Sequence, residues 1–404
     1  MSPADATVRK PPARLPDADG DFYLFSRVLS AEDDRIRLAV RRFMEQEVQP
    51  VIGGYWERDE FPFELLPGLK ALGIAGMGCE GYGCPGGSAT LLGFVTMEMA
   101  RVDASISTFV GVHSGLAMGS IYLCGSEEQK RRWLPPMAAM EKIGSFALTE
   151  PEVGSGAAGG LGTTARREGD TWVLDGRKKW IGNATWGDVT IVWARDVDDG
   201  QVKGFIVENA TSGFRVEKIL HKMALRVVQN GLITLDGCRV READRLQGAN
   251  SFRDTARVLV ATRAGVAWEA VGCARGAYEH ALRYAQRRVQ FGKPIAGFQL
   301  VQDLLFRMLC NITSSQALCL RLSQLQDQGL LREEHASLAK GVCTVRMRET
   351  VGWARELLGA NGILLDEQVG RFVADAEALY SYEGTREMNA LIVGRAITGF
   401  SAFA

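Results

Sequence analysis

Hydrophobic positions near the start of the chain recur with the period of an amphipathic helix. Ile36, Val40 and Phe43 stand at i, i+4 and i+7, so the three apolar side chains share one face. Ser30 suits the N-cap of this helix, and Pro50 predicts its end. Apolar or well-capped runs predict further helices over 89–100, 109–124 and 126–140.

The pattern changes to short β-like runs between about residues 145 and 250. Three Asp-Gly pairs, which are typical of type I′ hairpin turns, interrupt this region: Asp175-Gly176, Asp199-Gly200 and Asp236-Gly237. The flanking runs are rich in Val, Ile, Thr and aromatic residues, as strands are, at 171–174, 189–194 and 204–207. We therefore expect a compact antiparallel β domain here.

Helical spacing returns after about residue 251. A long proline-free segment over 257–290 predicts a helix well above average length, and two more long helices are expected over 298–328 and 332–358. Short links between them favour an antiparallel four-helix bundle. The predicted fold is mostly α with a central, barrel-like β domain. Its parts are a flexible arm (1–25), an N-terminal helical domain (26–144), the middle β domain (145–250) and the C-terminal bundle (251–404).

Composition excludes several functions. Lys and Arg number 47 against 48 Asp and Glu, so the chain lacks the basic excess of a nucleic-acid-binding protein. The four His are far apart and show no metal-ligand spacing, so no metal is expected. Eight scattered Cys without a C-x-x-C pair are typical of reduced, buried thiols in a cytoplasmic protein. The proline-rich N-terminus resembles no signal peptide, and without an apolar run of 18 residues no membrane span is expected.

No single short motif defines an activity, and no G-x-G-x-x-G supports a Rossmann nicotinamide site. Five stretches in a fixed order are more specific: Phe146–Ser155 (FALTEPEVGS), Lys179–Asn183 (KWIGN), Arg287–Pro294 (RRVQFGKP), Leu357–Gly362 (LLGANG) and Tyr382–Thr385 (YEGT). In this order and spacing, the chain from about Ser26 to Phe403 resembles the acyl-CoA dehydrogenase family. The chain is most similar in its motifs to two subgroups of this family, glutaryl-CoA dehydrogenase and the plant peroxisomal short-chain acyl-CoA oxidase. The stretches that carry this similarity are Val102–Ser105 (VDAS), Val227–Gly231 (VVQNG) and Gly394–Gly399 (GRAITG).

The resemblance implies FAD as cofactor and α,β-dehydrogenation of an acyl-CoA thioester to the trans-2-enoyl-CoA. It makes Glu383 the base that removes the α-proton, while flavin N5 accepts the β-hydride. A carboxylate in a closed apolar site has a raised pKa, which suits a general base. The implied cofactor-binding residues are Phe146, Leu148, Thr149, Gly154, Ser155, Trp180, Ile181, Gly182, Arg288, Phe291, Gln299, Glu356, Leu357, Gly359, Ala360, Thr385 and Glu387. The implied substrate-binding residues are Ser155, Arg263 and Gly384.

In the family, the residues that match Arg288 and Leu357–Ala360 reach FAD held mainly by a neighbouring subunit. The resemblance therefore implies a homotetramer, a dimer of dimers, with electron-transfer flavoprotein or O2 as electron acceptor. Two glycines depart from the pattern: Gly156 replaces an Asp, and Gly182 replaces a Thr that lies near flavin N5. The plant oxidases share this W-I-G-N stretch, which makes an acyl-CoA oxidase an alternative.

The glutaryl-specific enzymes carry an Arg shortly after Val-Asp, whereas residues 102–108 here hold no positive charge. Because a buried carboxylate without a partner is costly, we expect a short or branched monocarboxylic acyl chain. An acyl group on a carrier protein is a second possible substrate. A flavin monooxygenase and a flavin-free binding protein on the same scaffold are further alternatives, which Glu383, Trp180, Arg288 and Thr385 oppose.

Overall fold

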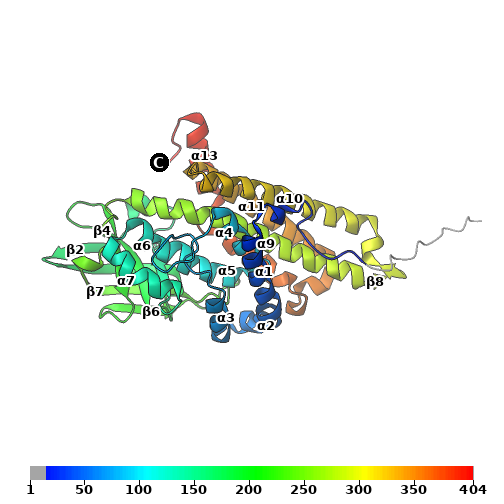
Figure 1. Ribbon diagram of the computed structural model, residues 1–404, viewed down its shortest axis with the longest axis horizontal. Helices are drawn as coiled ribbons and strands as arrows, with labels where there is room; N and C mark the ends of the chain where they lie inside the picture. The colour runs from blue at the N-terminus through cyan, green and yellow to red at the C-terminus, as the bar shows by residue number, and fades with distance from the viewer. Residues whose placement is uncertain (1–14, 404) are drawn as a thin grey trace, which may run out of the picture.

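The computed structural model describes residues 15–403 and contains three parts in the order α, β, α (Figure 1). The sheet lies at one end of the molecule and the short β8 hairpin at the opposite end, with long helices running between them. The mostly α fold class with a central β domain is confirmed. The part of the predicted flexible arm before Leu15 lies outside the described residues.

The N-terminal helices form around residues that the apolar pattern selected. Ser30 caps the first helix by accepting a hydrogen bond from the backbone N–H of Asp33, as expected. Pro50 does not end the helix: a π-turn, Met44–Val48, leads into a second helix, in whose first turn Pro50 stands. Proline is tolerated there because that N–H needs no intrahelical partner. The helices are α1 (Ala31–Phe43), α2 (Gln49–Arg58), α3 (Leu66–Ala71), α4 (Ala89–Ala100), α5 (Ala104–Val110), α6 (Gly119–Cys124) and α7 (Glu127–Ala138), with a π-helical segment η4 (Gly111–Met118) between α5 and α6.

The described residues form a curled seven-stranded sheet in the order β1-β4-β2-β3-β7-β6, with β5 on β4. Most neighbours are antiparallel, but β1 and β2 each pair parallel with β4. The strands are β1 (Gly144–Ala147), β2 (Thr164–Glu168), β3 (Thr171–Gly182), β4 (Val189–Asp196), β5 (Val202–Glu208), β6 (Phe214–Lys218) and β7 (Asn230–Arg241), and a one-turn helix α8 (Ala157–Gly160) lies between β1 and β2.

Of the three Asp-Gly pairs, one is a hairpin turn. Asp199-Gly200 joins β4 to β5, as predicted. The prediction is wrong for Asp175-Gly176 and Asp236-Gly237, which lie inside β3 and β7 at an irregularity in their pairing. There the carboxylate of Asp175 accepts a hydrogen bond of 2.7 Å from the N–H of Gly237. Such bulges increase the local twist of a strand pair, which helps the sheet to curl.

The C-terminal part is a bundle of long helices. Helix α9 (Phe252–Arg287) is the longest and is followed by the hairpin β8–β9 (Val289–Gln290 and Lys293–Pro294), α10 (Gln299–Asp327), α11 (Glu333–Leu357), α12 (Val369–Ser381) and α13 (Arg386–Thr398). The three long helices fall within a few residues of their predicted ranges. Helices α10, α11 and α12 all pack against α9.

Helix α9 also joins the bundle to the N-terminal helices at close range. A Cβ atom on Gly276 would stand 2.1 Å from the carbonyl oxygen of Arg101, and one on Gly93 would stand 2.3 Å from the indole nitrogen of Trp268. Only glycine permits this approach. Arg101 and Glu279 form a buried ion pair of 2.8 Å across the same contact. Helix α9 is therefore held on both sides and gives the site a rigid frame.

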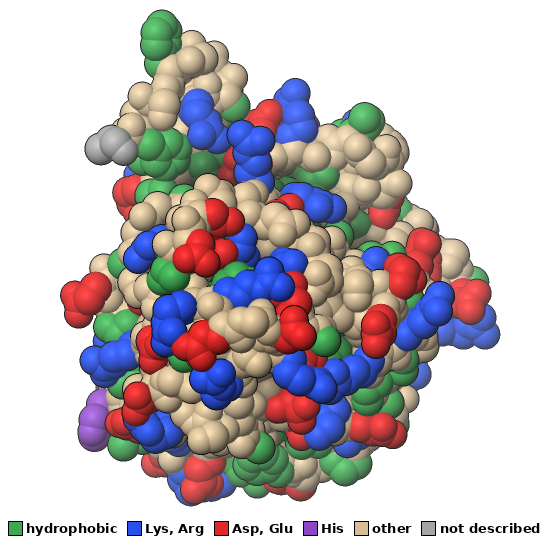
Figure 2. Space-filling view, turned by 90° about the vertical axis from the view of Figure 1, so that its left-hand side faces the viewer, with side chains coloured by type: hydrophobic (Ala, Val, Ile, Leu, Met, Phe, Trp, Pro, Cys, Tyr) green, Lys and Arg blue, Asp and Glu red, His purple; other side chains and the backbone are tan. Residues whose placement is uncertain are grey.

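One helical stretch, Ala104–Cys124, has the length and hydropathy of a membrane span. Half of this window is buried in the molecule, and the stretch packs against β1 and α9. Over the face seen in Figure 2, positive and negative side chains are interspersed and form no large patch of one sign.

Candidate functional site

Glu383 lies in the short connection between α12 and α13, in a constrained backbone. Its φ is +54°, in the left-handed region that non-glycine residues rarely adopt, and Gly384 follows with a φ of +88°. The Gly384 carbonyl accepts hydrogen bonds from the Lys340 ammonium (2.8 Å) and the Asn389 amide (2.9 Å). Lys340 also binds the Tyr380 carbonyl at 2.7 Å. These contacts hold the turn that presents Glu383.

The Glu383 carboxyl is only partly satisfied by the protein. The single proton of Thr262 Oγ1 is shared between Oε1 (3.2 Å) and the Val258 and Leu259 carbonyls (both 3.3 Å). Oε2 is buried and has no hydrogen-bond partner among residues 15–403. Burial raises the pKa of Glu383 above its usual value, opposed by the nearby Arg263 charge, the Thr262 hydroxyl and Lys340. A carboxyl with a raised pKa and one free oxygen can accept a proton from a bound molecule.

Arg263 stands next to Thr262 on α9 and is buried. Its Nε donates to the backbone carbonyl of Glu383 at 3.1 Å, and its guanidinium also contacts Ser337 Oγ (3.1 Å) and the carboxylate of Glu333 (3.6 Å). The guanidinium thus anchors the Glu383 turn. Its predicted contact with the CoA nucleotide stays a prediction.

The loop after β1 is attached to β3 by buried contacts. Phe146 and Leu148 are buried. The Thr149 carbonyl accepts from the Lys179 N–H at 2.8 Å, and the Lys178 ammonium binds the Leu148 carbonyl and forms a 2.9 Å ion pair with Glu150. Trp180 follows Lys179 in β3, so its backbone lies next to this loop.

Trp180 and the residues around it leave an open face that fits a flat flavin ring. Trp180 is 52% exposed despite its size, with a φ of +67°. Gly154 and Ser155 are exposed, and Gly154 has open space where a Cβ would point. Ile181 is buried, whereas a Cβ on Gly182 would make ordinary contacts with Val112 and Val228. Packing therefore does not demand glycine at 182. An exposed aromatic ring and an exposed Gly-Ser loop suit the apolar face and polar edge of FAD.

The other predicted cofactor residues lie at the far end of α9. Arg288 ends α9, and Phe291, at the tip of the β8–β9 hairpin, is 93% exposed with a φ of +51°. At 1.5 Å per residue, Arg288 lies about 37 Å from Arg263 along the helix. Gln299, Glu356, Gly359 and Ala360 are also exposed, and Leu357 is buried; Asn361 binds Tyr284 of α9 at 2.8 Å, which places the 356–360 segment at this same end. One chain therefore holds two separate groups of predicted residues.

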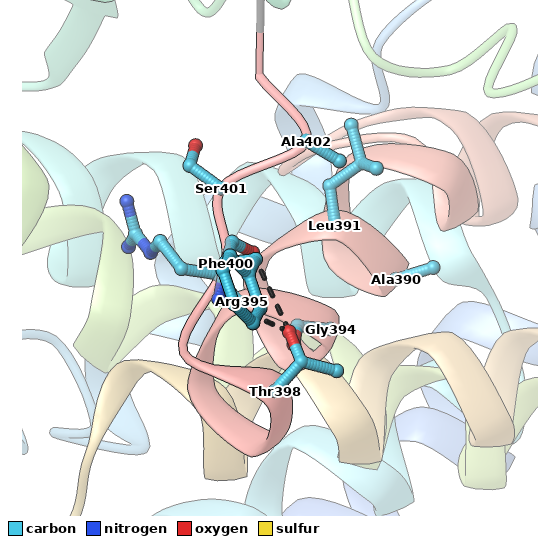
Figure 3. A pocket seen from close by; sticks show the side chains of 8 residues that line it. All are labelled: Ala390, Leu391, Gly394, Arg395, Thr398, Phe400, Ser401 and Ala402. Atoms are coloured by element: carbon cyan, nitrogen blue, oxygen red, sulfur yellow. Dashed lines mark hydrogen bonds between the residues drawn. The ribbon is translucent and has the colours of Figure 1, made fainter.

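Thr385 and Glu387 begin helix α13. Thr385 is its N-cap, since Oγ1 accepts from the Met388 N–H at 3.3 Å, and Glu387 is exposed in the first turn. Near this helix's other end, Figure 3 shows a shallow pocket between α13 and residues 400–402. It is lined by Ala390, Leu391, Gly394, Arg395, Thr398, Phe400, Ser401 and Ala402. None of the predicted site residues lines this pocket.

Sequence reasoning missed Thr262, Lys340 and Glu269. Thr262 was detectable as the neighbour of Arg263, and Glu269 because seven residues separate it from Thr262, which puts both on one helix face. Lys340 comes from a distant helix, and no sequence pattern links it to residue 384.

Comparisons with known proteins agree with this architecture. The family models for the N-terminal, middle and C-terminal domains of acyl-CoA dehydrogenases match residues 30–141, 145–238 and 252–398. An acyl-CoA dehydrogenase of Bacillus subtilis is 32% identical over 377 residues, 92% of this chain and 99% of its own length. A glutaryl-CoA dehydrogenase structure from Mycobacterium smegmatis is 41% identical, with a TM-score of 0.92 over 96% of this chain and all of that one. A second such structure from that organism, in complex with FADH2, is 36% identical with a TM-score of 0.93 over the same shares.

The helical, sheet and helical parts around a buried carboxyl and an exposed aromatic face define an oxidoreductase of the flavoprotein class. The chain belongs to the acyl-CoA dehydrogenase family. It is therefore an enzyme with FAD as cofactor that acts on acyl-CoA thioesters.

Proposed function

We propose that the protein catalyses α,β-dehydrogenation of a short or branched monocarboxylic acyl-CoA to the trans-2-enoyl-CoA, with Glu383 as the base. One observation carries the assignment: Glu383 Oε2 is buried and unpartnered within residues 15–403, while Thr262 fixes the orientation of Oε1. A buried acceptor without a donor is costly unless a ligand uses it. An α-proton of a bound thioester would do so.

The chain's own groups supply the proton chemistry. The α-proton passes to Glu383 Oε2, and the raised pKa of this carboxyl makes it a stronger base. The backbone N–H of Glu383 donates to the thioester oxygen as enolate charge develops, and Arg263 and Lys340 hold the turn in place for this contact. When bound, FAD supplies the acceptor for the β-hydride, and we assign its ring to the face beside Trp180 and Thr149.

We assign Arg288, Phe291, Gln299 and the 356–360 segment to FAD held by a second copy of the chain. Their exposure and their distance from Glu383 favour this arrangement over a role in the same chain's site. A homotetramer with two such pairs of subunits would complete every site. The cytoplasmic location stays a prediction.

The test is an anaerobic titration of the purified yellow protein with butyryl-CoA, with the visible flavin band as readout. We expect bleaching in the wild type, and bleaching at least about 100-fold slower in Glu383→Gln, which keeps the shape of the side chain but cannot take up a proton. Retained flavin absorbance in Glu383→Gln is the control for folding. The absence of bleaching by any short straight or branched acyl-CoA would overturn the assignment, and an acyl carrier protein thioester would be tested next.

An oxidase is the second candidate, because Gly182 leaves space where a larger side chain would fit. Admission of air after bleaching distinguishes the two acceptors. Fast return of the colour with release of peroxide, slowed in Gly182→Thr, would establish the oxidase. Slow return in air, together with fast return on addition of electron-transfer flavoprotein, would establish the dehydrogenase.

A further inference from the structure

A second buried acid stands on the same face of α9 as the residue that contacts Glu383. Glu269 follows Thr262 by seven residues, which is close to two helical turns, so both side chains leave the helix on one side. The rise places Glu269 about 10 Å further along α9. Glu269 is 5% exposed.

The opposite wall is formed by α5 and η4, which run alongside α9 in the reverse direction. At one end, Thr108 Oγ1 lies 2.9 Å from Glu269 Oε1. At the other end, a Cβ on Gly115 would stand 3.2 Å from Thr262 Cγ2. Thr108 and Gly115 are seven residues apart, as are Thr262 and Glu269. The two segments therefore run side by side over the length between these contacts.

Between these contact points each wall carries a glycine, Gly111 on one and Gly265 on the other. An added Cβ on either would meet no atom within 4 Å. Gly111 is exposed although both of its neighbours in the chain are at least half-buried. Between the Glu383 and Glu269 carboxyls, both walls thus carry a residue without a side chain, and the space beside these two glycines is called the slot below.

Glu269 keeps capacity to bind something else. The Tyr382 hydroxyl donates to Oε2 at 2.5 Å, and the Ser107 hydroxyl is close enough to lower the pKa of Glu269. The single proton of Thr108 Oγ1 is shared between Oε1 and the Ala104 carbonyl at 2.8 Å. A carboxylate can accept about four hydrogen bonds. No ion pair neutralises Glu269 within residues 15–403, and its burial raises its pKa to about 7.

We propose that Glu269 binds a hydrogen-bond donor, a hydroxyl or an ammonium, at the distal end of the acyl chain. This inference rests on the proposed function, which places the acyl α-carbon at Glu383. A chain that ended in a methyl group would leave the remaining acceptor capacity of the buried acid unused, and a chain that ended in a carboxylate would face a like charge. Residues 102–108 supply Thr108 to this acid and contain no positive charge.

The first experiment compares matched substrates on the wild-type holoenzyme. Butyryl-, pentanoyl- and hexanoyl-CoA are each compared with the ω-hydroxy and ω-amino acyl-CoA of the same length, with anaerobic flavin bleaching as readout. At the length that reaches Glu269, we expect kcat/KM to be about tenfold or more higher for a donor-ended chain, mainly through a lower KM. Equal or lower values at all three lengths would overturn the inference and leave the proposed function intact. No bleaching by any of the nine or by branched short acyl-CoAs would refute the proposed function itself.

The second experiment measures binding alone, in a Glu383→Gln background that does not turn over. Calorimetry with the preferred pair of thioesters should show the same discrimination, and Glu269→Leu should abolish it. Glu269→Gln separates the two donors: its amide oxygen still accepts from a hydroxyl, whereas preference for an ammonium requires the negative charge. Unchanged discrimination in Glu269→Leu, with flavin and thermal stability retained, would overturn the inference.

Discussion

The two groups of predicted site residues along α9 differ in how much of a site a single chain can form from them. At the inner end, Thr262 and Arg263 make short contacts with the Glu383 turn. At the outer end, Arg288, Phe291 and Gln299 are exposed. Acid–base chemistry needs groups fixed to within a fraction of an ångström, which a buried network provides. Residues that bind a cofactor held by another subunit must be exposed on the surface of their own chain. The predictions below test this division, beginning with the largest expected effect.

Charge reversal at the outer end should release the cofactor without unfolding the chain. Arg288→Glu replaces a fork suited to a diphosphate with a like charge, and we expect FAD retention to fall by about 100-fold. Arg287→Glu is the matched control on the adjacent residue. Dialysis followed by flavin absorbance measures retention, and Tm of the apoprotein should stay within a few degrees. An equal loss of FAD in both variants would contradict the assignment.

Arg263→Met removes the guanidinium that anchors the Glu383 turn. It removes the donor to the Glu383 carbonyl and the largest charge that lowers the pKa of Glu383, so kcat should fall by roughly 30-fold with little change in KM. Because Glu383 must be ionised to act, the acid limb of the rate profile should move to higher pH. Arg257→Met, an exposed position on the same helix, is the control. A rise in KM with kcat unchanged would support a CoA contact instead.

Thr262→Val tests one hydrogen bond. The hydroxyl stabilises the ionised form of Glu383, so its loss should raise the pKa of Glu383 further and move the acid limb upward, with a smaller loss of rate at neutral pH than in Arg263→Met. Thr262→Ser keeps the hydroxyl and should keep the profile. Identical profiles in Val and Ser variants would show that this contact does not tune the base.

Glu383→Gln should stabilise the fold at neutral pH. Since the folded-state pKa of Glu383 is raised, its contribution to stability is present below the unfolded pKa and is lost as pH rises through the folded pKa. We expect the variant to gain about 1 kcal/mol at pH 8 relative to wild type and little at pH 4, measured by urea unfolding of the apoprotein. A gain that does not depend on pH would exclude the ionisation of Glu383 as its cause.

Local signals predicted the helices well because caps and apolar periodicity act within a few residues. They failed at Pro50, where a π-turn reset the helix, and at Asp175 and Asp236, where pairing between β3 and β7 decided the conformation. Glu383 was found because its neighbours form a recognisable stretch. The spacing of Glu269 from Thr262 on one helix face was readable in the sequence, but the contacts of Lys340 arise only when distant helices pack, so no local pattern indicates them.

The slot along α9 also constrains how its substrate preference can change. A helix offers that face only at intervals of three or four residues. An acid could therefore serve the slot from Gly265, Val266 or Cys273, about one turn nearer to or further from Glu383, but not from the positions directly beside Glu269. A one-residue insertion before Glu269 would rotate it by about 100° away from the slot. Acyl-length preference in this scaffold should therefore evolve in discrete steps of about one turn.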